Sequence, residues 1–217
     1  AYINGEIAYA RGDVVEADQC FEKALELADD DYLRMRACLM RVRIRAEGEQ
    51  TKEGCMERVE LLLAADEELP EQYENVILEE LAQAYIDLAN ITGEKEPDLL
   101  AVSTLQKIIE KGWGSYLTHQ NLVILYQKHQ MFAEEQAQLD VMQDLYGEDY
   151  RIYKYRSLME VAIQNEKDNS ERSYETFREY YLRAEELYQE QKKENQSDAQ
   201  MQALAQLYQD MIDGGWL

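Results

Sequence analysis

Histidine and cysteine side chains are the groups with which this sequence could bind a metal or supply a nucleophile, but their spacing fits neither role. His119 and His129 lie ten residues apart, about 15 Å along one helix, which is too far for joint ligation of a metal ion. Cys20, Cys38 and Cys55 lack the paired spacing of a metal or redox motif, and no glycine-rich phosphate or dinucleotide loop occurs. We therefore expect no catalytic residues, no metal site, no cofactor and no enzymatic activity.

Arginine is concentrated in one segment of an otherwise acidic chain. Five of the 22 lysine and arginine residues fall between residues 34 and 45, inside a helical pattern. At 100° per residue they form two stripes, one of Arg34, Arg41 and Arg45 and the other of Arg36 and Arg43. The stripes either neutralise carboxylates on neighbouring helices or present forked donors to a partner's carboxylate or phosphate. The sequence leaves both interpretations open.

Net charge limits the partners that this chain can bind. The formal net charge is −23, from 45 acidic and 22 basic residues, so the phosphate backbone of a nucleic acid is repelled over long range. We expect the glutamate runs to form mainly solvated helix faces. Their second interpretation is a docking surface for a basic protein or peptide. No stretch reaches the roughly 20 apolar residues of a membrane span. We expect no nucleic acid, no membrane insertion and a cytoplasmic location with reduced cysteines.

Helices are the elements that must position these side chains. Hydrophobic residues make up 46% of the chain and aromatic residues 10%, whereas only two prolines and ten glycines occur, a composition typical of an all-α protein. Turn-like breaks fall near residues 12, 48, 93, 129 and 166, and a second set of breaks alternates with them. This period of roughly 40 residues predicts a series of helical hairpins.

Small, aromatic and apolar residues recur at fixed positions in these hairpins. In residues 5–29 the positions are held by Gly5, Ala8, Gly12, Asp13, Ala17, Phe21, Ala24, Leu25 and Leu27. This spacing resembles the tetratricopeptide repeat (TPR) family. Leu81, Ala82 and Tyr85 repeat the first-helix markers in the third hairpin, and Leu122 and Tyr126 do so in the fourth. An insertion around residues 91–97 and Asp29 in place of the family's closing proline depart from the pattern.

The resemblance implies an α-solenoid of about five helix-turn-helix repeats, with residues 1–217 forming a single domain. A capping helix over residues 197–213 is expected to cover the last apolar face. Ser197 with Gln200, and Asp13 with Glu16, have the spacing of a capping box. The chain begins without methionine and within a helical pattern, so we expect a fragment of a longer polypeptide with an upstream domain.

In a solenoid of this kind the first helix of each hairpin lines a concave groove. Besides one of the arginine stripes, the family register makes these residues groove candidates: Tyr2, Glu6, Tyr9, Val76, Glu79, Gln83, Ile86, Leu117, Gln120, Asn121, Ile124 and Gln127. The expected function is binding of a peptide or helix in this groove. The alternative is a regulatory or dimerisation segment of a larger multidomain signalling enzyme, such as a bacterial Ser/Thr protein kinase.

Overall fold

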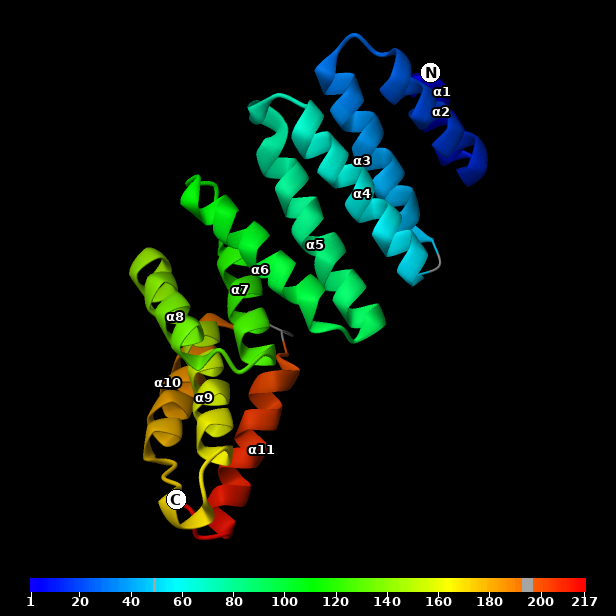
Figure 1. Cartoon of the computed structure of the whole chain (residues 1–217). Helices are drawn as coiled ribbons and strands as arrows, with labels where there is room; N and C mark the ends of the chain where they lie inside the picture. The colour runs from blue at the N-terminus through cyan, green and yellow to red at the C-terminus, as the bar shows by residue number, and fades with distance from the viewer. Residues whose placement is uncertain (49, 193–196) are drawn as a thin grey trace. The chain divides into compact units, whose positions relative to one another are not determined.

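The chain is all-helical in its computed structural model, which describes residues 1–48, 50–192 and 197–217 (Figure 1). Consecutive helices pack in pairs, and these ranges contain no β-strand, so the predicted fold class of an all-α protein is confirmed. The chain divides into two compact units, residues 1–114 and residues 115–217. The single repeat domain expected over residues 1–217 stays a prediction, because the two units are not placed relative to one another.

Unit 1 consists of three helical hairpins. The breaks predicted near residues 12, 48 and 93 all fall between its helices. A short 3-10 helix, Glu71–Tyr73, follows Pro70 and leads into the fifth helix, so the proline interrupts no α-helix. The helices are α1 (Tyr2–Ala10), α2 (Val14–Leu27), α3 (Asp31–Glu47), α4 (Lys52–Glu68), α5 (Glu74–Thr92) and α6 (Lys95–Glu110).

Unit 2 consists of two hairpins and a final helix. A 3-10 helix, Asn169–Glu171, separates its third and fourth α-helices. The helices are α7 (Tyr116–Lys128), α8 (Phe132–Tyr146), α9 (Tyr150–Asn165), α10 (Glu175–Gln191) and α11 (Ala199–Asp213). Ser115 begins α7 with a capping box, in which Ser115 and Thr118 each accept a hydrogen bond from the other's backbone amide.

The first hairpin is closed by a very close contact between α1 and α2. Phe21 on α2 is fully buried, and its ring packs so closely against α1 that a Cβ atom on Gly5 would lie 2.7 Å from it. Only glycine leaves room for the ring at this spacing. Ala8, Ala17 and Ala24 complete the buried interface of the pair. These are the small and aromatic positions that the sequence pattern marks.

Two helix caps differ from the expectation. Asp13 precedes α2, but its side chain accepts no cap hydrogen bond, because the tight turn at Gly12 leaves Asp13 at ψ 67° instead of in the extended conformation of an N-cap. Asp198, not Ser197, caps α11 and accepts hydrogen bonds from two backbone amides of its first turn. The capping boxes predicted for Asp13 and Ser197 are therefore wrong, and the final helix begins at residue 199 and not at residue 197.

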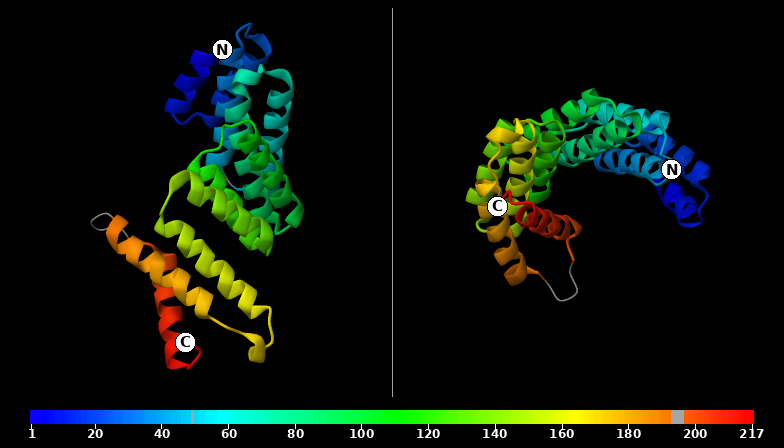
Figure 2. Two further views of the ribbon diagram at one scale, coloured as in Figure 1. Left: turned by 90° about the vertical axis from the view of Figure 1, so that its left-hand side faces the viewer. Right: turned by 90° about the horizontal axis from the view of Figure 1, so that it is seen from below.

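The final helix packs on an apolar face of unit 2. α11 lies against α9 and α10 (Figure 2). Met201, Leu204 and Met211 are buried in one cluster with Phe177 of α10. The ring of Tyr208 stacks on Tyr181 of α10 with 4.5 Å between the centroids, a favourable separation for two aromatic rings. The interface therefore fixes α11 through both aliphatic and aromatic packing.

Candidate functional site

The stripe of Arg34, Arg41 and Arg45 on α3 points toward α2 and α4. Arg34 donates a hydrogen bond to Glu68 on α4, and Arg45 donates one to Glu57 on the same helix, each at 2.8 Å. The three arginine side chains are only 26, 12 and 17% exposed, whereas Glu68 and Glu57 are 63 and 57% exposed. The guanidinium groups are therefore mostly covered, and the carboxylates lie outermost.

Arg41 and Arg45 share one carboxylate on α2. Oδ1 of Asp18 accepts hydrogen bonds from Nε of Arg41 at 2.9 Å and from a terminal nitrogen of Arg45 at 2.8 Å. Burial opposes ionisation of Asp18, but the hydrogen bonds from Arg45 and Arg41 outweigh it and hold the pKa of Asp18 below its ordinary value. Glu22 binds Arg41 as well, at 3.0 Å. This stripe thus fits internal charge neutralisation, the first of the two interpretations.

Arg36, from the second stripe, points toward α1. Its guanidinium carbon lies 5.9 Å from the ring centroid of Tyr2 and 6.0 Å from that of Tyr32, within the range of cation–π attraction. Its ion pair with Glu6 of α1 is long, at 3.6 Å, so it is not a hydrogen bond. The Arg36 side chain is 43% exposed. Two aromatic rings therefore orient a guanidinium group that remains accessible.

Arg43, two helical turns further along α3, also lies over a tyrosine ring of α1. Its guanidinium carbon lies 5.6 Å from the ring centroid of Tyr9, and its side chain is 60% exposed. Glu47 accepts hydrogen bonds from both Tyr9 and Arg43, which lower the pKa of Glu47. The structure thus brings together five of the predicted groove residues on one surface, called the α1–α3 face here: Tyr2, Glu6, Tyr9, Arg36 and Arg43.

The predicted groove residues of α5 lie on a partly exposed face of that helix. Glu79 and Gln83 are exposed, and Val76 and Ile86 are partly buried. Gln83 donates a hydrogen bond to Asp87 at 2.8 Å. These residues belong to unit 1, but no hydrogen bond or ion pair joins them to the α1–α3 face in the part of the chain that the structure describes.

The predicted groove residues of α7 are partly used inside unit 2. Gln120 donates a hydrogen bond to the hydroxyl of Tyr155 at 2.9 Å, and Gln127 donates one to Glu135 at 3.2 Å. Leu117 and Ile124 are exposed, and Asn121 is partly buried. The side-chain amides of Gln120 and Gln127, which the family register predicts to contact a partner, thus donate hydrogen bonds within unit 2.

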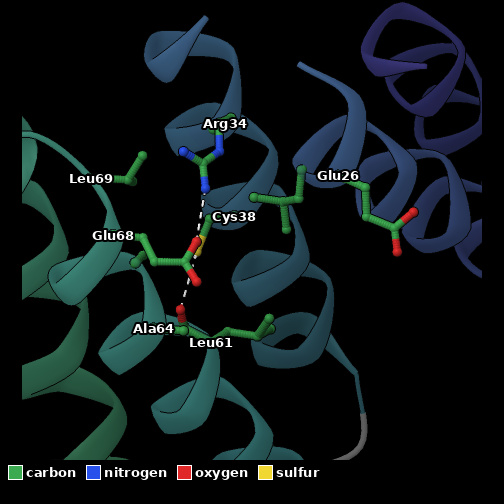
Figure 3. A pocket seen from close by; sticks show the side chains of 9 residues that line it. Glu26, Arg34, Cys38, Leu61, Ala64, Glu68 and Leu69 are labelled. Atoms are coloured by element: carbon green, nitrogen blue, oxygen red, sulfur yellow. Dashed lines mark hydrogen bonds and ion pairs between the residues drawn. The ribbon is translucent and has the colours of Figure 1, made fainter. Parts of the chain in front are cut away.

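A pocket between α2, α3 and α4 is a feature that the sequence did not indicate (Figure 3). Its volume is about 350 Å³, and the ion pair of Arg34 with Glu68 lies at its edge. This cavity, called the α2–α4 pocket here, is lined mainly by small or apolar residues, together with three charged ones. Its lining comprises Leu25, Glu26, Arg34, Cys38, Leu61, Ala64, Ala65, Glu68 and Leu69.

Burial shifts the pKa of two titratable side chains, Cys38 in unit 1 and His119 in unit 2. Burial raises the pKa of Cys38 to about 11, so its thiol stays protonated at neutral pH, and its Sγ lies 3.6 Å from the carbonyl oxygen of Leu61. His119 is buried, is hydrogen-bonded to Gln138, and has a pKa lowered by burial. Among the described residues, no group of three or more histidine, cysteine or acidic side chains could hold a metal ion.

Comparisons with known proteins found no match. Neither a protein-family model, nor a curated protein, nor a solved structure matches this chain. Within the described ranges, no helix is both long and apolar enough to cross a bilayer.

Proposed function

We propose that this chain is a TPR-like α-solenoid that acts as a protein–protein interaction module and binds a peptide or helix on the α1–α3 face. The observation that supports this proposal is the exposed pair Arg36 and Arg43, of which Arg36 lies over two tyrosine rings and Arg43 over one. The other stripe of α3 is used to bind carboxylates of α2 and α4. α1 and α3 are the first helices of consecutive hairpins, which is where the repeat family has its groove.

The α1–α3 face has the side-chain chemistry of a binding surface. Tyrosine and arginine are enriched among residues that dominate binding energy, because they combine large contact area with directed hydrogen bonds. The rings of Tyr2 and Tyr32 restrict Arg36 before any partner arrives, which lowers the entropy lost on binding. Glu6 lies between the aromatic residues of α1 and can pair with a cation of the partner.

Charge reversal on the two stripes tests the proposal. Peptides are first selected from a random display library on the full chain, and their affinities are then measured by fluorescence anisotropy. We expect Arg36→Glu with Arg43→Glu to lower the affinity for the selected peptides by at least about tenfold. The two substitutions replace forked hydrogen-bond donors by carboxylates, which repel the acceptor groups of the peptide. The helical circular dichroism should stay unchanged, since both arginines are largely exposed.

The matched control changes the other stripe. Arg41→Glu with Arg45→Glu alters net charge by the same amount but places two carboxylates beside Asp18, so it should lower the stability of unit 1. At a temperature where this control is still folded, its affinity for those peptides that Arg36→Glu with Arg43→Glu weakens should stay within about threefold of wild type, the range of a long-range charge effect. Equal losses of affinity in both double variants would contradict a binding role for the α1–α3 face.

The solenoid architecture has its own test. In a solenoid each repeat contacts only its neighbours, so the particle is longer than it is wide. Small-angle X-ray scattering of the full chain should therefore give a radius of gyration clearly above the roughly 17 Å that globular scaling predicts for this length. A value near 17 Å, with the distance distribution of a sphere, would refute the solenoid.

A further inference from the structure

A second cavity lies beside the α2–α4 pocket, between α3 and α4. The second cavity has a volume of about 410 Å³ and is lined by Arg41, Arg45, Glu57 and Glu60, together with Leu61 and Ala64. Leu61 and Ala64 also line the first cavity. The two cavities are therefore neighbours on unit 1 and are together called the depression here; its α3 residues, among them Arg34, Arg41 and Arg45, are called the floor.

The first cavity is suited to one apolar side chain. Its interior is lined by Leu25, Leu61 and Leu69, with the small residues Cys38 and Ala65. All three leucines are partly exposed, so apolar surface remains in contact with water. A leucine-sized side chain placed there removes this surface from water, which is the main source of binding energy for an apolar anchor.

The rim of the depression is anionic although its floor contains three arginines. Each arginine of the floor is already paired with carboxylates of α2, α3 or α4. Glu26 on α2 and Glu60 on α4 add two exposed carboxylates that form no ion pair with any residue in the described ranges. Figure 3 shows the Glu26 carboxylate directed away from Glu68. The cluster holds seven carboxylates and three guanidinium groups, a net charge of 3 − 7 = −4: Asp18, Glu22, Glu26, Asp31, Glu57, Glu60 and Glu68 against Arg34, Arg41 and Arg45.

We propose that this depression is a second protein-binding site, which takes a short basic peptide segment that inserts one apolar side chain into the α2–α4 pocket. Lysine or arginine residues of the segment contact the carboxylates of the rim. From Arg34 to Arg45 the floor spans eleven residues of helix, or about 16 Å, which an extended segment of about five residues covers. The site is distinct from the α1–α3 face, because it lies over α2 and α4 and uses the opposite arginine stripe.

The probe is a peptide with one leucine between two lysine pairs, acetyl-GKKLKKG-amide, titrated into the ¹⁵N-labelled full chain. We expect saturable chemical-shift changes in amides of α2 and α4 around Leu25, Leu61 and Leu69. The serine-for-leucine peptide and the glutamate-for-lysine peptide should each bind at least about tenfold more weakly, since one lacks the apolar anchor and the other carries repelled charges. No saturable shift at about 1 mM peptide, the weak limit of specific affinity, would overturn the proposal.

Two variants test the location of the site. Ala64 is exposed and lines both cavities, so Ala64→Trp fills the depression and should weaken the lysine–leucine peptide by about tenfold or more. Its matched control is Ala137→Trp, at an exposed alanine inside α8 of unit 2. Unchanged affinity in Ala64→Trp, or an equal loss in Ala137→Trp, would overturn the proposed location.

The charge requirement is tested separately. Glu26→Lys with Glu60→Lys should lower the affinity for the peptide by about tenfold. Glu179→Lys with Glu190→Lys makes the same change of net charge on α10 and should lower this affinity by about threefold at most. Equal effects of the two pairs would show general attraction to an acidic protein and would overturn the site. Arg36→Glu with Arg43→Glu should leave the affinity for this peptide within about threefold of wild type. The proposal for the depression and the proposal for the α1–α3 face can therefore be refuted independently.

Discussion

Replacing Asp87 by alanine should lower the free energy of unfolding of unit 1 by about 3 kcal/mol, because it leaves the buried charge of Arg58 without its partner. The Arg58 side chain on α4 is only 2% exposed and donates a hydrogen bond to Oδ2 of Asp87 on α5 at 2.7 Å. Nε of Arg58 is buried without a hydrogen-bond partner in the structure, so the ion pair is its main compensation. Asp87 itself is 27% exposed, which places the expected loss at the lower end of the range for buried pairs.

Urea unfolding followed by tryptophan fluorescence measures this loss. Trp113 lies in unit 1 and Trp216 in unit 2, so a Trp216→Phe background makes the signal report on unit 1. Adding Arg58→Met to Asp87→Ala should restore most of the stability, because an apolar side chain of similar length leaves no buried charge. Glu80→Ala, at an exposed position of the same helix, should change stability by less than about 0.5 kcal/mol. A loss in Asp87→Ala no larger than in Glu80→Ala would show that the ion pair contributes nothing.

Unit 2 should lose stability as the pH rises from about 5 to 8, and Glu135→Gln should abolish most of this loss. The Glu135 side chain on α8 is fully buried. Gln127 donates to one of its oxygens at 3.2 Å, while the other has no hydrogen-bond partner in the structure. Burial raises the pKa of Glu135 to about 8, since the charged form loses its hydration. A glutamine at this position keeps the shape without the cost of ionisation.

The direction in which stability changes with pH follows from the number of protons bound in the folded and in the unfolded state. Between the ordinary pKa of glutamate and about pH 8, the folded chain keeps the Glu135 proton and the unfolded chain has lost it, so stability falls with rising pH. The expected fall is on the order of 4 kcal/mol. His119 acts in the opposite direction, because burial lowers its pKa and folding therefore becomes more favourable as the pH passes its ordinary value.

The difference between wild type and Glu135→Gln isolates the glutamate, because both chains contain His119. Urea unfolding in a Trp113→Phe background, where Trp216 reports on unit 2, should give that difference at each pH. We expect the variant to be the more stable chain at pH 8 and the advantage to shrink toward pH 5. A difference that does not change between these pH values would mean that Glu135 is already ionised in the folded chain.

Helix positions were predictable from the sequence because turns and helix interiors use different residues. The breaks at Gly12 and Gly93 coincide with positive φ angles that favour glycine. The two arginine stripes were also predictable, since they follow from 100° per residue alone. Which helix each stripe meets was not predictable, because that depends on how one hairpin packs on the next.

Side-chain partners distant in sequence were the part that could not be predicted. Arg58 and Asp87 lie 29 positions apart, and nothing in either helix indicates that they meet. Glu135 did leave a signal, because it precedes the buried residues Leu139 and Met142 by four and seven positions and so falls on the apolar face of its helix. The α2–α4 pocket left no comparable signal, since a cavity is defined by the space between three helices.

The first turn of α11 depends on a residue of another helix. Asp198 caps α11 through its Oδ1 atom, while its Oδ2 atom accepts a hydrogen bond at 2.8 Å from Lys154 of α9, whose side chain is 6% exposed. If α11 came away from unit 2, it would lose this anchor, and the buried ammonium group of α9 would lose its counter-ion at the same moment. Terminal helices ordinarily fray independently of the core. Here opening of the last helix is thermodynamically linked to loosening of α9, so the end of the chain belongs to the same cooperative folding unit as the helices that it covers.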